Sequence, residues 1–148
     1  MNGRARTAVL TVALVLTLAG CTGFAFLFGE TSSSPQEDMI GSWTIMMTSG
    51  PVDVSEFMTL VIRSNNTLSF INGDNETVED NDITEITDSS FVGTITLQTS
   101  NPSLVGETTY AEYEVSELSG TRYLRVAFYE DSTKTTRFVT FTCEEFTK

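Results

Sequence analysis

The stretch RYLRVAFY, which covers residues Arg122–Tyr129, alternates between two kinds of side chain. One parity carries Leu124, Val126 and Phe128, with Arg122 at its end, and the other carries Tyr123, Arg125 and Tyr129. Successive side chains of a β-strand point to opposite faces of the sheet. A period of two therefore predicts a strand with one buried and one solvated face, and it favours an all-β fold around this stretch.

Seven further stretches of the chain have a similar composition. Thr, Val, Ile, Phe and Tyr favour a pleated, half-buried surface, and Gly, Pro, Asn, Asp and Ser mark the turns between them. The predicted strands are Ser42–Thr48, Glu56–Arg63, Thr67–Ile71, Ile83–Thr87, Phe91–Gln98, Thr108–Val115 and Thr135–Cys143. Short links favour antiparallel pairing of consecutive strands. We predict an eight-stranded antiparallel up-and-down barrel over residues 39–148, which leaves no exposed edge; a β-sandwich is the alternative.

The N-terminus has the pattern of an export signal. Arg4 and Arg6 precede an uncharged apolar run, which ends in Leu18-Ala19-Gly20-Cys21. These last four residues resemble the lipobox of bacterial lipoproteins. The resemblance implies that residues 1–20 are removed as a signal peptide and that Cys21 is lipidated. Residues 21–38 are the predicted tether: after the apolar Phe24–Phe28, the segment Glu30–Asp38 is polar, Ser-rich and broken by Pro35, which predicts a flexible linker.

The apolar run also permits a second interpretation. The segment Ala8–Phe28 has no charged residue and is long enough to cross a bilayer as an uncleaved helix. In either interpretation the domain lies outside the cytoplasm and is held at a membrane. We therefore expect a cell-envelope location, with the membrane as a partner through the N-terminal lipid.

The charge of the chain excludes one class of partner. Its 20 acidic and 8 basic residues give a formal net charge of −12, and removal of residues 1–20 would leave 6 basic residues against the same 20 acidic ones. Binding to nucleic acid depends on Lys and Arg side chains that displace counterions from the phosphates. We therefore expect no nucleic acid partner.

The first predicted strand opens with Gly41-Ser42-Trp43. This Gly-x-Trp, followed by seven more strands, resembles the lipocalin-like domains of small bacterial lipoproteins. In that family the Trp closes one end of the barrel and an Arg from a late strand packs across it. The resemblance implies this role for Gly41, Trp43 and an arginine: Arg122 is favoured over Arg125 and Arg137 because it has the inward parity of its strand. The Thr-Asp-Tyr signature of transport lipocalins is missing before the seventh strand.

The sequence offers little catalytic or metal-binding chemistry. It contains no histidine, which excludes Ser-His and Cys-His nucleophile pairs and most zinc sites. Glu112 and Glu114 have the solvated parity of their strand. The acidic run Asp74–Asp82 lacks the spacing of a calcium loop and is expected to be a solvated loop. We expect no enzymatic activity, no cofactor and no metal, and we expect Cys143 to be a small buried apolar group.

Two functions remain open. The first is a binding module that holds a small apolar or amphiphilic ligand at the open end of the barrel. Its lining candidates are Leu60, Ile62, Phe70, Ile95, Leu97, Tyr113, Leu124 and Phe128. Because these side chains are large, the second function is a structural or interaction protein of the envelope with a filled core and no ligand cavity. The corresponding partners are a small hydrophobic ligand or an envelope protein.

Overall fold

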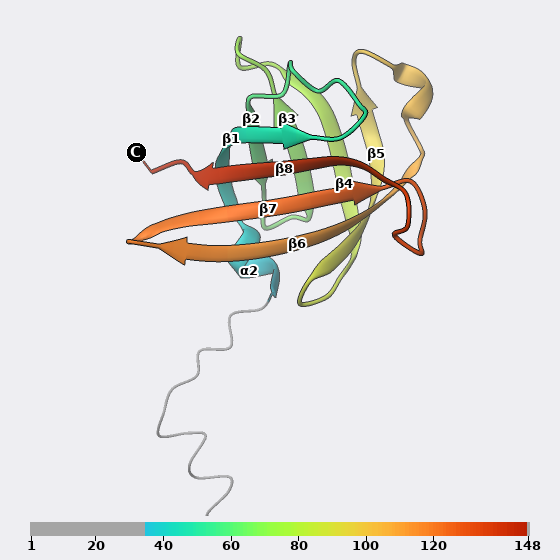
Figure 1. Cartoon of the computed structure of the whole chain (residues 1–148). Helices are drawn as coiled ribbons and strands as arrows, with labels where there is room; N and C mark the ends of the chain where they lie inside the picture. Colours follow the sequence, from blue (N-terminus) through green and yellow to red (C-terminus); the bar gives the residue numbers. More distant parts are fainter. Residues whose placement is uncertain (1–34, 148) are drawn as a thin grey trace, which may run out of the picture. The chain divides into compact units, whose positions relative to one another are not determined.

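The computed structural model describes residues 35–147, and in this part of the chain a short helix precedes eight strands (Figure 1). The elements are α2 (Pro35–Met39), β1 (Gly41–Ser49), β2 (Thr59–Ile62), β3 (Thr67–Ile71), β4 (Thr77–Ile86), β5 (Ser90–Gln98), η1 (Pro102–Leu104), β6 (Thr108–Leu118), β7 (Thr121–Tyr129) and β8 (Arg137–Glu145). The signal peptide, Cys21, most of the tether and the segment Ala8–Phe28 lie outside the described residues.

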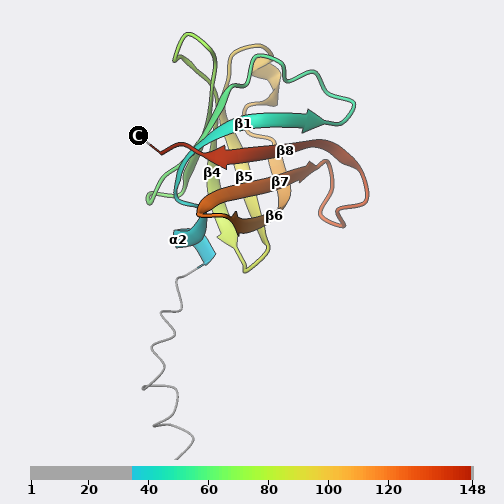
Figure 2. The same cartoon turned by 60° about the vertical axis from the view of Figure 1, so that its left-hand side comes forward.

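The strands form a closed antiparallel barrel, as Figures 1 and 2 show from two directions. Each strand pairs with its neighbour in sequence, and β8 returns to pair with β1. The predicted eight-stranded up-and-down barrel is confirmed, and the β-sandwich alternative is wrong. The architecture is compatible with a lipocalin-like fold.

The hairpin turns follow local backbone chemistry. β6 and β7 are joined by Ser119 and Gly120, which both have positive φ, as a two-residue hairpin turn requires. Gly50, with φ 141°, ends β1 where a Cβ atom would lie 2.3 Å from the carbonyl oxygen of Phe138. Only glycine allows the chain to leave β1 so close to the start of β8.

The hydrophobic core lies inside the barrel. Its largest fully buried side chains include Trp43 near α2 and Phe70, Phe91, Phe128 and Phe141 on the inner faces of the strands. Residues Ser33–Lys148 form one compact unit, whose barrel closes on itself and whose core is complete within residues 35–147. We therefore expect this unit to fold on its own.

The structure corrects the expected boundaries in the middle of the chain. β4 begins at Thr77, so most of the acidic run Asp74–Asp82 is strand and not a solvated loop. The predicted fourth strand, Ile83–Thr87, covers only its second half. The sequence pattern missed the first half because Glu79 and Asn81 occupy inward positions, where a strand normally shows apolar side chains.

A second correction concerns Leu97, which was expected to face inward. Its side chain is 37 % exposed, whereas Ile95 is 7 % exposed. In the β4–β5 pairing Asp80 lies opposite Leu97 and Asn81 lies opposite Ile95, so Thr96 is an extra residue that forms a β-bulge. A single extra residue reverses the parity beyond it. Gln98 therefore faces the interior in place of Leu97.

Cys143 is fully buried at the inner face of β8, as expected for a small apolar group. Burial raises the pKa of its thiol to about 12. The group is therefore a protonated thiol at neutral pH.

Candidate functional site

One end of the barrel lies beside α2, and Trp43 is fully buried there. The indole Nε1–H donates a hydrogen bond of 2.9 Å to the backbone carbonyl of Met39, the last residue of α2. The guanidinium of Arg122 lies 5.3 Å from the centre of the Trp43 ring. It also donates to Glu145 Oε1 at 2.7 Å and to the backbone carbonyl of Asp38. β1, β7, β8 and α2 are thereby joined at one point.

This junction includes a residue that was expected to belong to the tether, because Asp38 is part of α2. Met39, the first residue of the predicted domain, is fully buried against the core. Gly41 begins β1 with φ 155°, a backbone conformation that residues with a side chain rarely adopt. A Cβ atom there would make only an ordinary contact with Trp43 Nε1, at 3.6 Å, so the backbone conformation and not the space favours glycine.

A cavity of about 240 Å³ lies at the opposite end of the barrel. The loops 50–58 and 99–107 border it, and η1 belongs to the second loop, at the far end of the barrel from α2 (Figure 1). Ser100 Oγ donates to Glu56 Oε1 at 2.5 Å and so connects the two loops. The two loops at the mouth of the cavity are therefore joined by a hydrogen bond.

The floor of the cavity is apolar and mostly aromatic. Phe57 comes from the loop 50–58 and stacks on Phe70 of β3, with 4.6 Å between ring centres. Phe70 in turn lies 4.9 Å from Phe141 of β8, and Phe128 of β7 closes the group. Such rings provide a large apolar surface with defined geometry.

The structure divides the expected lining residues into three groups. Phe70, Ile95 and Phe128 line the cavity. Leu60, Ile62, Tyr113 and Leu124 are buried inside the barrel and do not line it. Leu97 lies on the outer face, for the reason given above. The alternation of apolar residues thus predicted which side chains face the interior of the barrel. It did not predict which of them line a cavity.

One wall of the cavity is polar, and Glu79 of β4 lies at its centre. Asn81 Nδ2 donates to Glu79 Oε1 and Gln98 Nε2 donates to Glu79 Oε2, each at 2.8 Å. Thr109 Oγ1 donates weakly to Asn81 Oδ1 at 3.4 Å. Burial raises the pKa of Glu79 above its ordinary value, although the two amide hydrogen bonds act in the opposite direction.

The register of the sheet explains why Glu79 points inward. Glu79 lies directly opposite Phe70 on β3 and opposite Gln98 on β5. Residues that face each other across antiparallel strands point to the same side of the sheet. Phe70 belongs to the core, so its partner Glu79 faces the interior, and the bulge at Thr96 brings Gln98 to the same side.

Sequence reasoning missed Glu79, Asn81 and Gln98. Glu79 and Asn81 stand at inward positions, where alternation expects an apolar residue. Strict alternation places Gln98 on the outer face, because it does not anticipate the bulge at Thr96. The sequence of Thr77–Asp82 gives only an ambiguous signal for a strand. It begins with β-prone residues, but polar residues follow at both inward and outward positions. Such a pattern is typical of a loop and also of a strand that faces a polar cavity.

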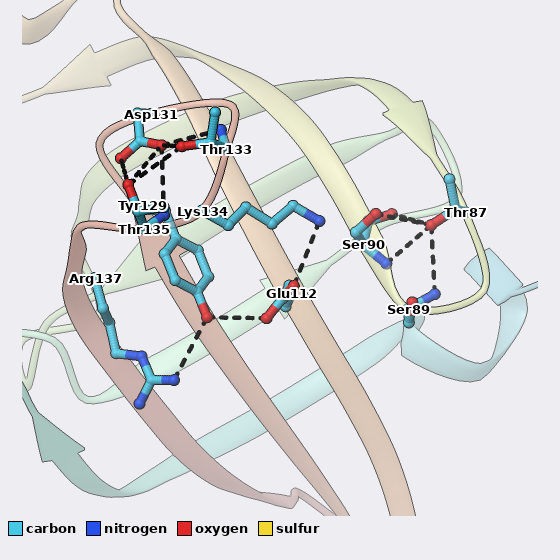
Figure 3. Close-up of polar contacts among 10 residues, drawn as sticks. All are labelled: Thr87, Ser89, Ser90, Glu112, Tyr129, Asp131, Thr133, Lys134, Thr135 and Arg137. Carbon is cyan, nitrogen blue, oxygen red and sulfur yellow. Dashed lines mark hydrogen bonds and ion pairs between the residues drawn. The ribbon is translucent and has the colours of Figure 1, made fainter.

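The outer face of β6, β7 and β8 carries a second polar cluster, drawn in Figure 3. Tyr129 donates through its hydroxyl to Glu112 Oε2 at 2.9 Å, and Lys134 Nζ lies 3.7 Å from Glu112 Oε1. Arg137 lies over the Tyr129 ring, 5.8 Å from its centre. Glu112 and Glu114 are both exposed, as their parity predicted. Because Tyr129 and Lys134 already occupy Glu112, this cluster is a surface network between neighbouring strands.

The loop between β7 and β8 is organised by Asp131, also visible in Figure 3. Its carboxylate accepts hydrogen bonds from the backbone N–H groups of Thr133 and Thr136, at 3.0 Å and 3.1 Å; Figure 3 draws Asp131 with Thr133 and Thr135. It also accepts from the Thr133 hydroxyl. These bonds hold the pKa of Asp131 well below its usual range. The carboxylate therefore acts as the acceptor that orders the loop.

Within residues 35–147 no three acidic or cysteine side chains gather closely enough to ligate a metal ion. The same part of the chain contains no helix long and apolar enough to span a bilayer.

Comparison with known proteins gives no family assignment. No protein-family model matches the chain, and no characterised protein sequence matches it. The candidate site therefore has to be interpreted from its own geometry.

Proposed function

We propose that this chain is an exported lipoprotein, anchored through lipid on Cys21, and that its barrel binds a small apolar or amphiphilic ligand. The observation that carries the proposal is the cavity of about 240 Å³ at the barrel end opposite Trp43. An apolar floor with a few placed polar groups is the usual composition of a small-molecule site. The export pattern and the lipobox-like Leu18–Cys21 support the anchor.

The size of the cavity limits the ligand. Small-molecule pockets usually enclose about 300–1,000 Å³, whereas an apolar cavity of about 150 Å³ holds a benzene ring. A cavity of about 240 Å³ fits one ring with a short substituent, or an alkyl chain of about six carbons. Long-chain lipids do not fit inside it.

Binding is tested with straight-chain alcohols of increasing length, titrated into the domain Ser33–Lys148 and followed by NMR. We expect shifts at Phe57, Phe70 and Phe128 but not at Trp43, and loss of binding once the chain exceeds the cavity. The blocking variant is Ile95→Trp, and its matched control is Leu97→Trp, two residues away on the outer face of β5. Binding that survives in Ile95→Trp, or no binding by any alcohol, would refute the cavity as the site.

The anchor needs its own experiment. In a bacterial host, Cys21→Ala in the full chain should abolish both radioactive acyl labelling and the mobility change that accompanies signal removal. Unchanged labelling and mobility would refute the lipobox interpretation and favour the uncleaved helix Ala8–Phe28.

A second candidate function, an interaction protein of the envelope, is favoured by one observation. Four apolar side chains of β1 and the loop 50–58 are strongly exposed: Met46, Met47, Val52 and Met58. All four lie between residues 46 and 58, and exposed apolar groups that form a contiguous patch are typical of contact surfaces. If the alcohols do not bind, these four side chains are the next to test.

A further inference from the structure

We infer that the ligand of this cavity carries a positive charge: the geometry points to a small apolar amine whose ammonium group pairs with Glu79. This inference rests on the proposed function, because it names the chemical class of ligand for the same cavity.

The first argument is the unfilled hydrogen-bonding capacity of Glu79. An ionised carboxylate offers about four lone-pair positions on its two oxygens. One position on each oxygen is filled, by the amides of Asn81 and Gln98. Both amides hold the carboxylate in place from the protein side, and the remaining positions are left for a donor inside the cavity, which Glu79 lines. An ammonium group has three donors and no acceptor, so it fits these positions.

The second argument is the absence of a counter-charge. Asp53, Glu56 and Glu79 line the cavity, and none of the described residues around it is basic. Glu56 and Asp80 further disfavour the charged form of Glu79 by repulsion. Glu79 is partly buried, and a carboxylate that is partly withdrawn from water is stabilised by a partner of opposite charge. A cationic ligand supplies the charge that the protein does not.

The third argument comes from the floor of the cavity. Phe57, Phe70 and Phe141 present aromatic rings below the polar wall. The faces of such rings attract cations weakly and accept apolar groups strongly. A ligand with one ammonium head and a short apolar body therefore matches both surfaces.

The same features disfavour the anions that apolar barrels could otherwise accept. A fatty acid would bring its carboxylate close to Glu79, or to Asp53 and Glu56 at the mouth. Like charges at such short separations repel, and the repulsion is stronger where water is excluded. The cavity should therefore discriminate between ligands of one shape by the sign of their head group.

The test uses three ligands of equal chain length: hexylamine, 1-hexanol and hexanoate. Each is titrated into the domain Ser33–Lys148 at neutral pH and low ionic strength, with dissociation constants from NMR shifts. We expect hexylammonium to bind about tenfold or more tightly than 1-hexanol, because a charge-assisted hydrogen bond is roughly twice as strong as a neutral one. Hexanoate should bind most weakly.

Two variants test whether Glu79 causes the preference for the amine. Glu79→Gln should remove the preference for the amine and retain binding of 1-hexanol. The matched control Glu76→Gln removes the same charge from the exposed turn before β4, and it should keep the full preference. An amine preference of unchanged size in Glu79→Gln overturns the inference.

A measurement on the unmodified protein keeps the inference testable if Glu79→Gln does not fold. The Glu79 carboxyl carbon is followed by NMR against pH, together with those of Asp53, Glu56 and Asp80. Saturation with hexylamine should lower the pKa of Glu79, and saturation with 1-hexanol should not. No difference between the two overturns the inference.

The outcomes also separate the two proposals. If 1-hexanol binds as tightly as hexylamine, the charge inference fails and the cavity keeps its proposed function. If none of the three ligands binds, the proposed function fails and the inference fails with it.

Discussion

At the residue scale, Trp43 holds the end of the barrel beside α2 through its single polar atom. Trp43→Phe leaves the Met39 carbonyl without its donor and leaves a gap in a fully buried position. We expect the free energy of unfolding to fall by about 2–4 kcal/mol, from the lost hydrogen bond and the cavity together. Urea unfolding followed by circular dichroism measures the change.

The control for this prediction is another aromatic residue near the same end of the barrel. Phe146 is exposed, directly after β8, so Phe146→Leu should change the free energy of unfolding by no more than about 0.5 kcal/mol. Equal stability of Trp43→Phe and Phe146→Leu would contradict the closing role of the indole.

Also at the residue scale, Glu79 should lower the stability of the ligand-free domain as pH rises. Burial raises its pKa above the ordinary value of 4.5, so between 4.5 and the raised value the folded protein holds a proton that the unfolded chain has released. The free energy of unfolding contributed by this group therefore decreases with pH across that window. Below the window both states are protonated, and the penalty is absent.

Glu79→Gln removes this dependence, because an amide does not titrate. The quantity to follow is the free energy of unfolding of Glu79→Gln minus that of the unmodified domain. This difference should rise from about pH 4 towards neutral pH, whatever the difference is at about pH 4. Urea unfolding at several pH values measures it. A difference that stays constant, or falls as pH rises, would show that Glu79 is not destabilised by burial.

At the scale of the elements, apolar alternation predicted the strands whose inner faces are apolar and failed where they are not. The pattern in Arg122–Tyr129 matches β7, because Leu124, Val126 and Phe128 all enter the core. The first half of β4 was missed because Glu79 and Asn81 replace apolar residues at inward positions. The polar wall of the site lay in the very segment that alternation assigns to a loop.

The bulge at Thr96 is the other feature that strict alternation cannot predict, and it can be tested by a pair of substitutions in β5. Ile95→Asp places a carboxylate in the interior and should cost about 3 kcal/mol or more, whereas Leu97→Asp places it on the outer face and should cost under about 1 kcal/mol. Thermal and urea unfolding provide the measurement. Similar, large costs for both variants would mean that parity continues through β5 without a bulge, because Ile95 and Leu97 would then share the inner face.

At the scale of the whole molecule, closure of the barrel follows from the number of strands and the short links, which are visible in the sequence. The position of the cavity is not visible there, because it depends on which inward side chains meet. Trp43 and α2 fill one end, while Val54 and Phe57 of the loop 50–58 only partly fill the other. A loop that folds back into a barrel leaves no periodic signal, so the size of the site had to come from the structure.

The molecule as a whole also carries an excess of negative charge that its fold does not neutralise. Residues 35–147 contain five basic residues against nineteen acidic ones, and the salt bridges in this part of the chain include Arg122–Glu145 and Lys134–Glu112. Repulsion among unpaired surface carboxylates disfavours the compact state, and salt screens that repulsion. We therefore expect stability to increase with ionic strength.

The measurement is urea unfolding of the domain Ser33–Lys148 in sodium chloride from about 0.01 M to 0.5 M. Over this range the Debye length falls from about 30 Å to a few ångströms, and the free energy of unfolding should increase by on the order of 1 kcal/mol. The double variant Asp74→Asn/Glu76→Gln removes two exposed charges from the turn before β4, so its dependence on salt should be weaker. Potassium chloride should act like sodium chloride, because screening depends on ionic strength and not on the identity of the cation. Stability that falls with salt, or that rises only with one cation, would contradict general repulsion and point to a specific ion effect.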